Sequence, residues 1–237
     1  MESGAVSDSD VFICDGGEQI GNDYVRCAVY PYAHGTETLG EVIQNSCNDG
    51  MMAIGRKMGA ALLLDYQSRF NFGSRTGIDL PNESSGAIYT LDQMKDMELA
   101  STTFGQGFTS TMIQEISAIS AVINGGTYYQ PHVVKEIKSQ EDGSVLKTNE
   151  GNVLKQIVSS DVSEKIREYM GMSVTSGTSR KSKVQGYSMG GKTGTAEILS
   201  TEEKDYLVSF IGFAPLDTPQ VVVYVVVDRP NVEEQAD

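Results

Sequence analysis

The sequence predicts an α+β fold in which a helical region packs on an antiparallel sheet. Helical periodicity dominates the first part of the chain, and three strand-like runs lie near its end, at Tyr187–Ile198, Tyr206–Ala214 and Gln220–Val227. The links between these runs are shorter than the dozen or so residues that a parallel crossover needs. The runs are therefore expected to be antiparallel neighbours, which argues against a doubly wound α/β sheet.

Amphipathic stretches with capping signals account for the expected helices. Thr38 and Glu41 fit a capping box, in which hydroxyl and carboxylate each bond the other residue's backbone amide, and Thr111 with Gln114 fits a second one. Apolar residues follow the first box at helical spacing as far as Phe70, and others follow the second until Gly125-Gly126. A further amphipathic helix is expected at Ser160–Met172.

Turn-forming residues separate these helices. Asn71–Ser85 is rich in Gly, Asn and Pro and is expected to be a loop. His132–Lys147 is expected to be a β-hairpin that turns at Asp142-Gly143. We interpret residues 1–237 as one partial domain, with a helical part at about 36–130, the hairpin at 132–147 and a sheet part at about 187–228.

Composition limits the classes of function. The 237 residues carry 18 Lys and Arg against 32 Asp and Glu, a net charge of −14, which argues against nucleic acid because a phosphate backbone needs a basic face. No apolar run reaches the roughly 18 residues of a membrane span, and the acidic start is unlike a signal peptide. Met1–Ser3 followed by Gly4 is typical of a helix end, so the chain is expected to be truncated there, and also at its C-terminus before a closing helix.

The cysteines form no metal-binding pattern in the sequence. Cys14, Cys27 and Cys47 include no CxxC pair, and only two histidines accompany them, so no metal site and no cofactor are expected. Cys14 and Cys27 flank a short polar segment, Asp15–Arg26. Two interpretations stay open: a disulfide in an oxidising compartment, or two small buried thiols.

One motif suggests a nucleotide hydrolase. Gly186–Thr193 satisfies the P-loop pattern GxxxxGK[ST], and the apolar run that ends at Asp228 resembles a magnesium-binding strand. A P-loop must follow a buried strand and open a helix, however. The residues at 173–185 are polar, and Gly194-Thr195 is a poor first turn of a helix. A P-loop NTPase is therefore a remote alternative.

Two tripeptides point to a serine acyltransferase. Ser46-Cys47-Asn48 and Lys192-Thr193-Gly194 occur in the order of the S-x-N and K-T-G elements of enzymes that react with penicillin. Longer segments extend the similarity: His34–Val42, Thr76–Pro81, Phe104–Gly107, Val174–Thr178, Gly191–Ala196 and Ser209–Pro215. Together they resemble the class B penicillin-binding proteins over about 1–230.

The resemblance implies a β-lactamase/transpeptidase-like fold and D,D-transpeptidation. A serine attacks the D-Ala-D-Ala end of a peptidoglycan stem peptide, and the acyl group passes to an amine of a neighbouring strand. By resemblance Ser46 relays a proton, Asn48 positions the catalytic lysine and the substrate amide, and Lys192 supplies positive potential. Taken singly, Ser46 and Asn48 also fit a helix end and Lys192 a solvated strand lysine.

The residues after Lys192 are implied to bind substrate. Thr193 and Thr195 would hydrogen-bond the terminal carboxylate, the Thr195 amide would be half of an oxyanion hole, and Gly194 would leave room for the substrate. Implied partners are the stem peptide, β-lactams, and cell-division or sporulation membrane proteins. The implied place is the extracytoplasmic face of the bacterial membrane, with an anchor outside this chain.

The nucleophile itself is missing from the pattern. Ser144–Lys147 is the one S-x-x-K match, but it follows S-x-N instead of preceding it and lies on the expected hairpin. Activation needs serine and lysine one turn apart on a helix face. The nucleophile is therefore expected before Met1, and the chain alone is expected to be inactive. Alternatives are a non-catalytic cell-wall peptide-binding protein, and a β-lactam sensor or β-lactamase.

Overall fold

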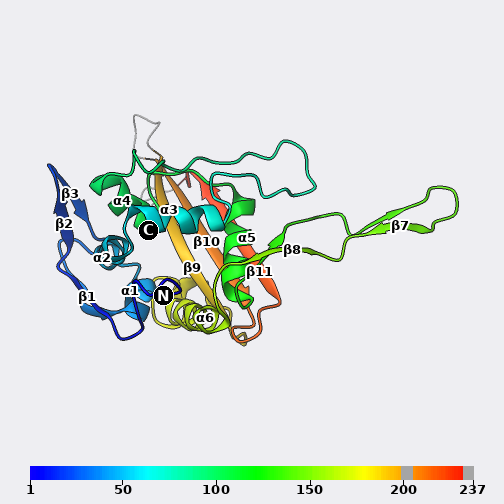
Figure 1. Ribbon diagram of the computed structural model, residues 1–237. Helices are drawn as coiled ribbons and strands as arrows, with labels where there is room; N and C mark the ends of the chain where they lie inside the picture. The colour runs from blue at the N-terminus through cyan, green and yellow to red at the C-terminus, as the bar shows by residue number, and fades with distance from the viewer. Residues whose placement is uncertain (199–204, 232–237) are drawn as a thin grey trace.

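A three-stranded antiparallel sheet forms the centre of the molecule (Figure 1). The computed structural model describes residues 1–198 and 205–231. The sheet has the order β11-β10-β9, with β9 at Gly190–Ile198, β10 at Asp205–Ala214 and β11 at Val221–Asp228. All three expected runs are strands and both pairings are antiparallel. The link expected at Leu199–Asp205 lies outside the described residues except for its last residue.

Two helices cover one face of this sheet. Residues Met112–Ile123 form α5, which packs on β11, and Ser160–Thr175 form α6, which packs on β9. Ile211 and Phe213 of β10 are two residues apart, so they point to the same face. There they form a buried cluster with Ile123 and Met170 of the helices. The α+β prediction is confirmed.

Four more helices, α1 to α4, come earlier in the chain than the strands of the sheet. The capping boxes at Thr38 and Thr111 are both present. The elements have these bounds: α1 Leu39–Asn45, α2 Asn48–Met58, α3 Ala60–Arg69 and α4 Asp96–Thr103. Helix α4 was not predicted, because a short helix that begins at Asp96 has no Ser, Thr, Asp or Asn before it as a capping signal.

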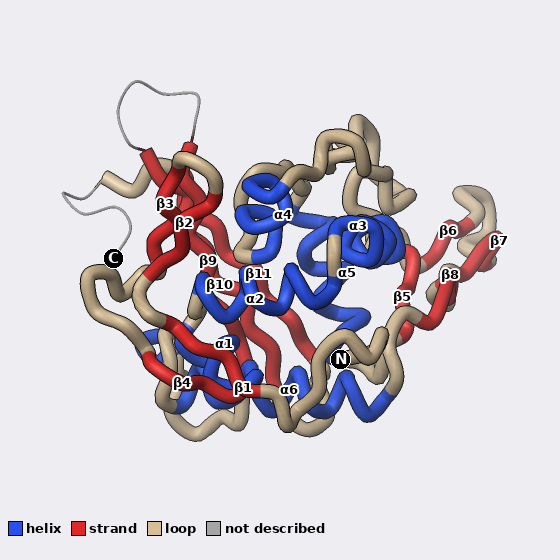
Figure 2. Tube along the Cα trace, turned by 60° about the vertical axis from the view of Figure 1, so that its left-hand side comes forward, coloured by secondary structure: helices blue, strands red, loops and turns tan. Residues whose placement is uncertain are grey.

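Short strand pairs surround this centre. The N-terminal pairs are β1 with β4 and β2 with β3, which lie beside α1 and α2 (Figure 2). The expected hairpin is present as β6 with β7, and an inner pair, β5 with β8, extends it into a long arm. The bounds are β1 Val11–Cys14, β2 Gly17–Ile20, β3 Asp23–Arg26, β4 Gly35–Thr38, β5 Thr127–Gln130, β6 Glu136–Lys138, β7 Val145–Thr148 and β8 Asn152–Gln156.

Met1–Ser3 forms a turn in this chain, not a helical segment. The amide of Gly4 donates to the Met1 carbonyl at 2.8 Å, and Gly4 has the left-handed φ of 76° that the sequence interpretation assumed. Within residues 1–198 and 205–231, no helix combines the length and the apolar character needed to cross a membrane.

Candidate active site

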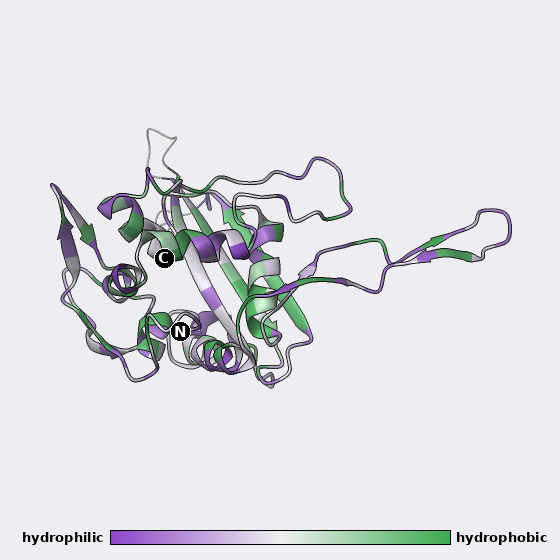
Figure 3. Ribbon diagram, viewed as in Figure 1, coloured by the Kyte–Doolittle hydropathy of each residue, from purple (hydrophilic) through white to green (hydrophobic). Residues whose placement is uncertain are grey.

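Ser46 and Lys192 meet although 146 residues separate them. Lys192 Nζ donates a hydrogen bond of 2.8 Å to Ser46 Oγ and another of 3.0 Å to the Thr193 carbonyl. Lys192 is the third residue of β9. Figure 3 shows β9 as the least hydrophobic strand of the sheet. The pairing makes both simpler interpretations, a helix end for Ser46 and a solvated lysine for Lys192, insufficient.

The junction between α1 and α2 presents Ser46 to the lysine. Ser46 ends α1 in the left-handed region, at φ 55° and ψ 45°, and its amide bonds back to the Ile43 carbonyl. Such a conformation is unfavourable for a residue with a side chain unless the surroundings hold it. Cys47 follows at once as the N-cap of α2, so the reversal places the serine hydroxyl outside both helices.

Burial changes the acidity of Lys192. Desolvation lowers the pKa of Lys192 from 10.5 to about 8, because burial disfavours the charged ammonium. At neutral pH the side chain remains mostly protonated and donates to Ser46 Oγ. The site therefore carries a positive charge that is more easily lost than that of an ordinary lysine.

The lowered pKa predicts a titration near pH 8 in the folded chain. Between about pH 8 and 10.5 the unfolded chain keeps a proton that folded Lys192 has lost, so this group makes folding more favourable as pH rises through that window. NMR of ¹³Cε-labelled lysine measures the midpoint, and Lys192→Met identifies the signal by its disappearance. A midpoint that stays near 10.5 would contradict the buried position.

Strand β9, which carries Lys192, has one edge that no other described strand pairs with. Among the described residues no strand pairs with the edge of β9 that faces away from β10. The Thr193 amide donates to Ser179 Oγ at 3.1 Å, and the Thr195 carbonyl accepts from Gln106 Nε2 at 3.2 Å, so both backbone groups point to this edge. Because N–H and C=O of one strand residue point to the same side, the Thr195 amide also faces the edge.

Gly194 leaves room for the Ser209 hydroxyl of the neighbouring strand. A Cβ at this position would lie 2.8 Å from Ser209 Oγ of β10. The sequence interpretation explained this glycine by room for substrate, but the crowding seen here is with the neighbouring strand. Both reasons favour glycine.

Three further residues border the edge and were not singled out as site residues. Thr178 and Ser179 follow α6: Thr178 Oγ1 lies 3.4 Å from Thr193 Oγ1, and the Thr178 amide donates to the Gln44 carbonyl at the end of α1. Gln106 reaches β9 from the loop after α4. Thr178 and Gln106 belong to the V-T-S-G-T and F-G-Q-G segments, and Ser179 directly follows the first of these. The resemblance of these segments to the family could therefore have identified them.

Asn48 lies at the start of α2 and bonds to the end of β3. Its Nδ2 donates to the Arg26 carbonyl at 2.9 Å, and no hydrogen bond joins it to Lys192 in the described part of the chain. Asn48 here ties the start of α2 to the end of β3. Its role toward a catalytic lysine stays a prediction.

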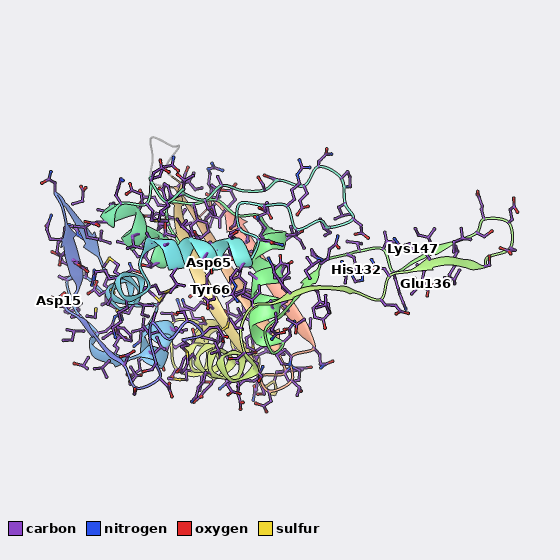
Figure 4. The ribbon with its side chains drawn as sticks, in the orientation of Figure 1. Asp15, Asp65, Tyr66, His132, Glu136 and Lys147 are labelled. Carbon is purple, nitrogen blue, oxygen red and sulfur yellow. The ribbon has the colours of Figure 1, made fainter. Side chains whose placement is uncertain are left out.

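Neither competing motif has the geometry that its function needs. Lys192–Thr195 continues as strand β9, so no helix follows the GxxxxGK[ST] match and the P-loop geometry is absent from the described residues. Ser144 donates to Asp142 Oδ1 at 2.7 Å at the tip of the arm, and Figure 4 shows Lys147 on that arm, away from the body of the molecule. The S-x-x-K match at Ser144 is therefore not the nucleophile of this site.

Comparison with known proteins gives one consistent family. The model of the penicillin binding protein transpeptidase domain matches residues 1–237. Stage V sporulation protein D of Bacillus subtilis is 43% identical over 201 residues, which cover 84% of this chain and 31% of that protein. Peptidoglycan D,D-transpeptidase MrdA of Acinetobacter baumannii is 29% identical over 94% of this chain and 35% of its own length. The chain spans about a third of the length of these relatives.

Solved structures share the fold. Penicillin binding protein 3 of Mycobacterium tuberculosis, complexed with aztreonam, superposes with a TM-score of 0.86 at 28% identity, over 97% of this chain and 53% of that one. The D,D-transpeptidase domain of a peptidoglycan glycosyltransferase from Eggerthella lenta also has a TM-score of 0.86, at 26% identity over 97% of this chain and 57% of its own.

Proposed function

The chain belongs to the penicillin binding protein transpeptidase domain family, and from that membership we propose that it forms the substrate-orienting part of a peptidoglycan D,D-transpeptidase. The observation that carries the proposal is the Lys192–Ser46 hydrogen bond beside the open edge of β9. A positive charge, a hydroxyl that can relay a proton, and a strand edge that is not paired with another strand are what acyl transfer to a serine requires around its nucleophile.

The substrate would add to β9 as a short extended strand. The D-Ala-D-Ala carboxylate would accept from Thr193 and Thr195, near the positive charge of Lys192. The Thr195 amide would then donate to the oxyanion that forms on the attacked carbonyl. A β-lactam has a carboxylate and a strained amide in a similar arrangement, so it would occupy the same edge.

Ser46 would act on the leaving group. The nucleophilic serine loses its proton as it bonds to the carbonyl carbon, and the departing amine needs one when the C–N bond breaks. Ser46 Oγ would relay this proton, accepting one as it delivers its own, while Lys192 stays protonated and donates to it. The nucleophilic serine is proposed to lie outside these 237 residues, because the only S-x-x-K in the sequence is on the arm.

Relatives suggest where such an enzyme works. One is named a stage V sporulation protein and another a peptidoglycan D,D-transpeptidase. We therefore propose cell-wall synthesis on the extracytoplasmic face of a bacterial membrane, in contact with sporulation or division membrane proteins.

Labelling with a fluorescent penicillin tests this division of roles. The 237-residue chain should stay unlabelled in a denaturing gel, because its one S-x-x-K match lies on the arm. A longer form that includes an upstream S-x-x-K should label, and excess unlabelled penicillin should prevent it. Covalent labelling of the 237-residue chain would overturn the proposal, and a longer form that never labels would favour the non-catalytic peptide-binding alternative.

A further inference from the structure

The three cysteines and one histidine form a single cluster in the structure. One ligand atom from each of Cys14, Cys27, His34 and Cys47 lies within 4.8 Å of all the others. The three cysteines are buried free thiols, and the His34 side chain is only 14% exposed. The structure thus agrees with the second interpretation of Cys14 and Cys27, as buried thiols, and adds Cys47 and His34 to them.

The spacing of the four atoms is close to that of a tetrahedral metal site. Cys27 Sγ lies 3.9 Å from Cys47 Sγ and 3.7 Å from His34 Nδ1. Zinc bonds of about 2.3 Å to sulfur and about 2.0 Å to nitrogen place tetrahedral ligands about 3.8 Å apart for two sulfurs and about 3.5 Å apart for sulfur and nitrogen. These two pairs are within about 0.2 Å of the tetrahedral distances, and the other pairs, all within 4.8 Å, would contract by at most about 1.3 Å.

Backbone amides are oriented toward two of the sulfurs. The His34 amide donates to Cys14 Sγ, and the Gly50 amide donates to Cys47 Sγ, each at 3.4 Å. Gly50 is in the first turn of the eleven-residue helix α2, whose N-terminal dipole also favours negative charge. Such groups stabilise thiolates, the form in which cysteine binds a metal.

Two buried carboxylates beside the cluster lack a cation. Glu37 is 2% exposed and Asp49 5% exposed, and each has one carboxylate oxygen without a hydrogen-bond partner. Glu37 Oε2 lies 3.8 Å from His34 Nδ1. Across the part of the chain that the structure describes, neither carboxylate forms an ion pair with Lys or Arg. Zn²⁺ with three thiolates and an imidazole carries a net charge of −1, so the ion would not neutralise these carboxylates. Their free oxygens are hydrogen-bond acceptors beside the proposed ligands.

We propose that Cys14, Cys27, His34 and Cys47 bind one structural Zn²⁺ ion. Three thiolates and an imidazole are ligands that zinc favours, and four protein ligands leave no open position for catalysis. Binding displaces up to three thiol protons to solvent and forms three Zn–S bonds and one Zn–N bond. This assignment replaces the expectation of no metal, which considered spacing along the chain and not in space.

The ion would join four separate segments next to the catalytic residues. Cys14 ends β1, Cys27 follows β3, His34 precedes β4, and Cys47 lies between Ser46 and Asn48. Holding Cys47 fixes the junction that presents Ser46 to Lys192. The proposed ion is thus a positioning element for the site, and its presence does not depend on the proposed reaction.

Metal analysis of the reduced, purified chain tests the site. Mass spectrometry of the metal content should find about one zinc per chain, and Co²⁺ in its place should give the strong visible absorption of a tetrahedral thiolate site. A chelator should lower the Tm of the chain, and added Zn²⁺ should restore it. Zinc content well below stoichiometry after incubation with Zn²⁺, or an octahedral Co²⁺ spectrum, would overturn the proposal.

Variants at the two histidines assign the ligands. His34→Ala should weaken zinc binding by roughly 100-fold or more, whereas His34→Cys should keep the ion and shift the Co²⁺ spectrum toward four sulfurs. His132→Ala, on the arm, is the matched control and should bind zinc as the unmodified chain does. Unchanged binding in His34→Ala, or loss of binding in His132→Ala, would contradict the assignment.

Discussion

Replacing Ser46 with alanine should slow penicillin acylation of the complete transpeptidase by about 10²–10⁴-fold, the usual contribution of a positioned proton-transfer group. The variant keeps the fold but removes the acceptor of the 2.8 Å hydrogen bond from Lys192. The proton path to the leaving amine is then broken. The measurement is the second-order rate of labelling by a fluorescent penicillin, in a form of the protein that contains its S-x-x-K.

Ser144→Ala is the matched control for this experiment. Ser144 lies on the arm and its hydroxyl donates to Asp142, so removing the hydroxyl should leave the acylation rate unchanged. Equal rates for Ser46→Ala and the unmodified protein would contradict the role of Ser46. A large effect of Ser144→Ala would contradict the conclusion that its S-x-x-K match is unrelated to the site.

Gly126→Ala should destabilise the chain by more than about 4 kcal/mol, at the extreme of single substitutions. Gly126 connects α5 to β5 at a φ of 96°, and an added Cβ would collide with the Val158 carbonyl and come within 2.7 Å of Gln156 Nε2. The Ile157 amide donates to the Gly126 carbonyl across the same contact, so the strands cannot separate without losing that bond. Urea unfolding followed by circular dichroism measures the loss.

Gly125 serves as the control that separates backbone strain from the collision of the added Cβ. Gly125 has the same φ of 96°, but an added Cβ there meets no atom within 4 Å. Gly125→Ala should therefore show only the backbone strain, about 1–2 kcal/mol. If both variants lost the same stability, the collision at Gly126 would be refuted as the cause.

Local patterns predicted most elements of the fold. The Thr38 and Thr111 capping boxes, the hairpin turn and the three terminal strands depend on residues close in sequence, and all are present. Helix α4 was not predicted because its N-cap residue is Lys95, which is not one of the residue types that usually cap a helix. The inner strands β5 and β8 were not predicted because they lie on either side of the β6–β7 hairpin. Their pairing joins residues too far apart in the sequence for a local pattern to indicate it.

The candidate site was predicted in part. The S-x-N and K-T-G segments identified Ser46 and Lys192 because these residue types occur in a recognisable order. The resemblance assigned Asn48 to position the lysine of the S-x-x-K element. In this structure its amide donates to the Arg26 carbonyl, and its role toward that lysine stays a prediction. A motif names a residue type and leaves the direction of its side chain to the surrounding packing.

By itself the sequence determined the fold class, through periodicity and the length of the links. The resemblance of its motifs predicted the family and the site residues Ser46 and Lys192–Thr195. Only the tertiary structure decided which residues meet. Lys192 reaches Ser46 across 146 residues, and three cysteines with no spacing pattern gather with His34 where β1, β3 and α2 converge. The physical reason is that the packing of α1 and α2 against β1 and α6 sets these distances, and such packing joins segments far apart in the chain.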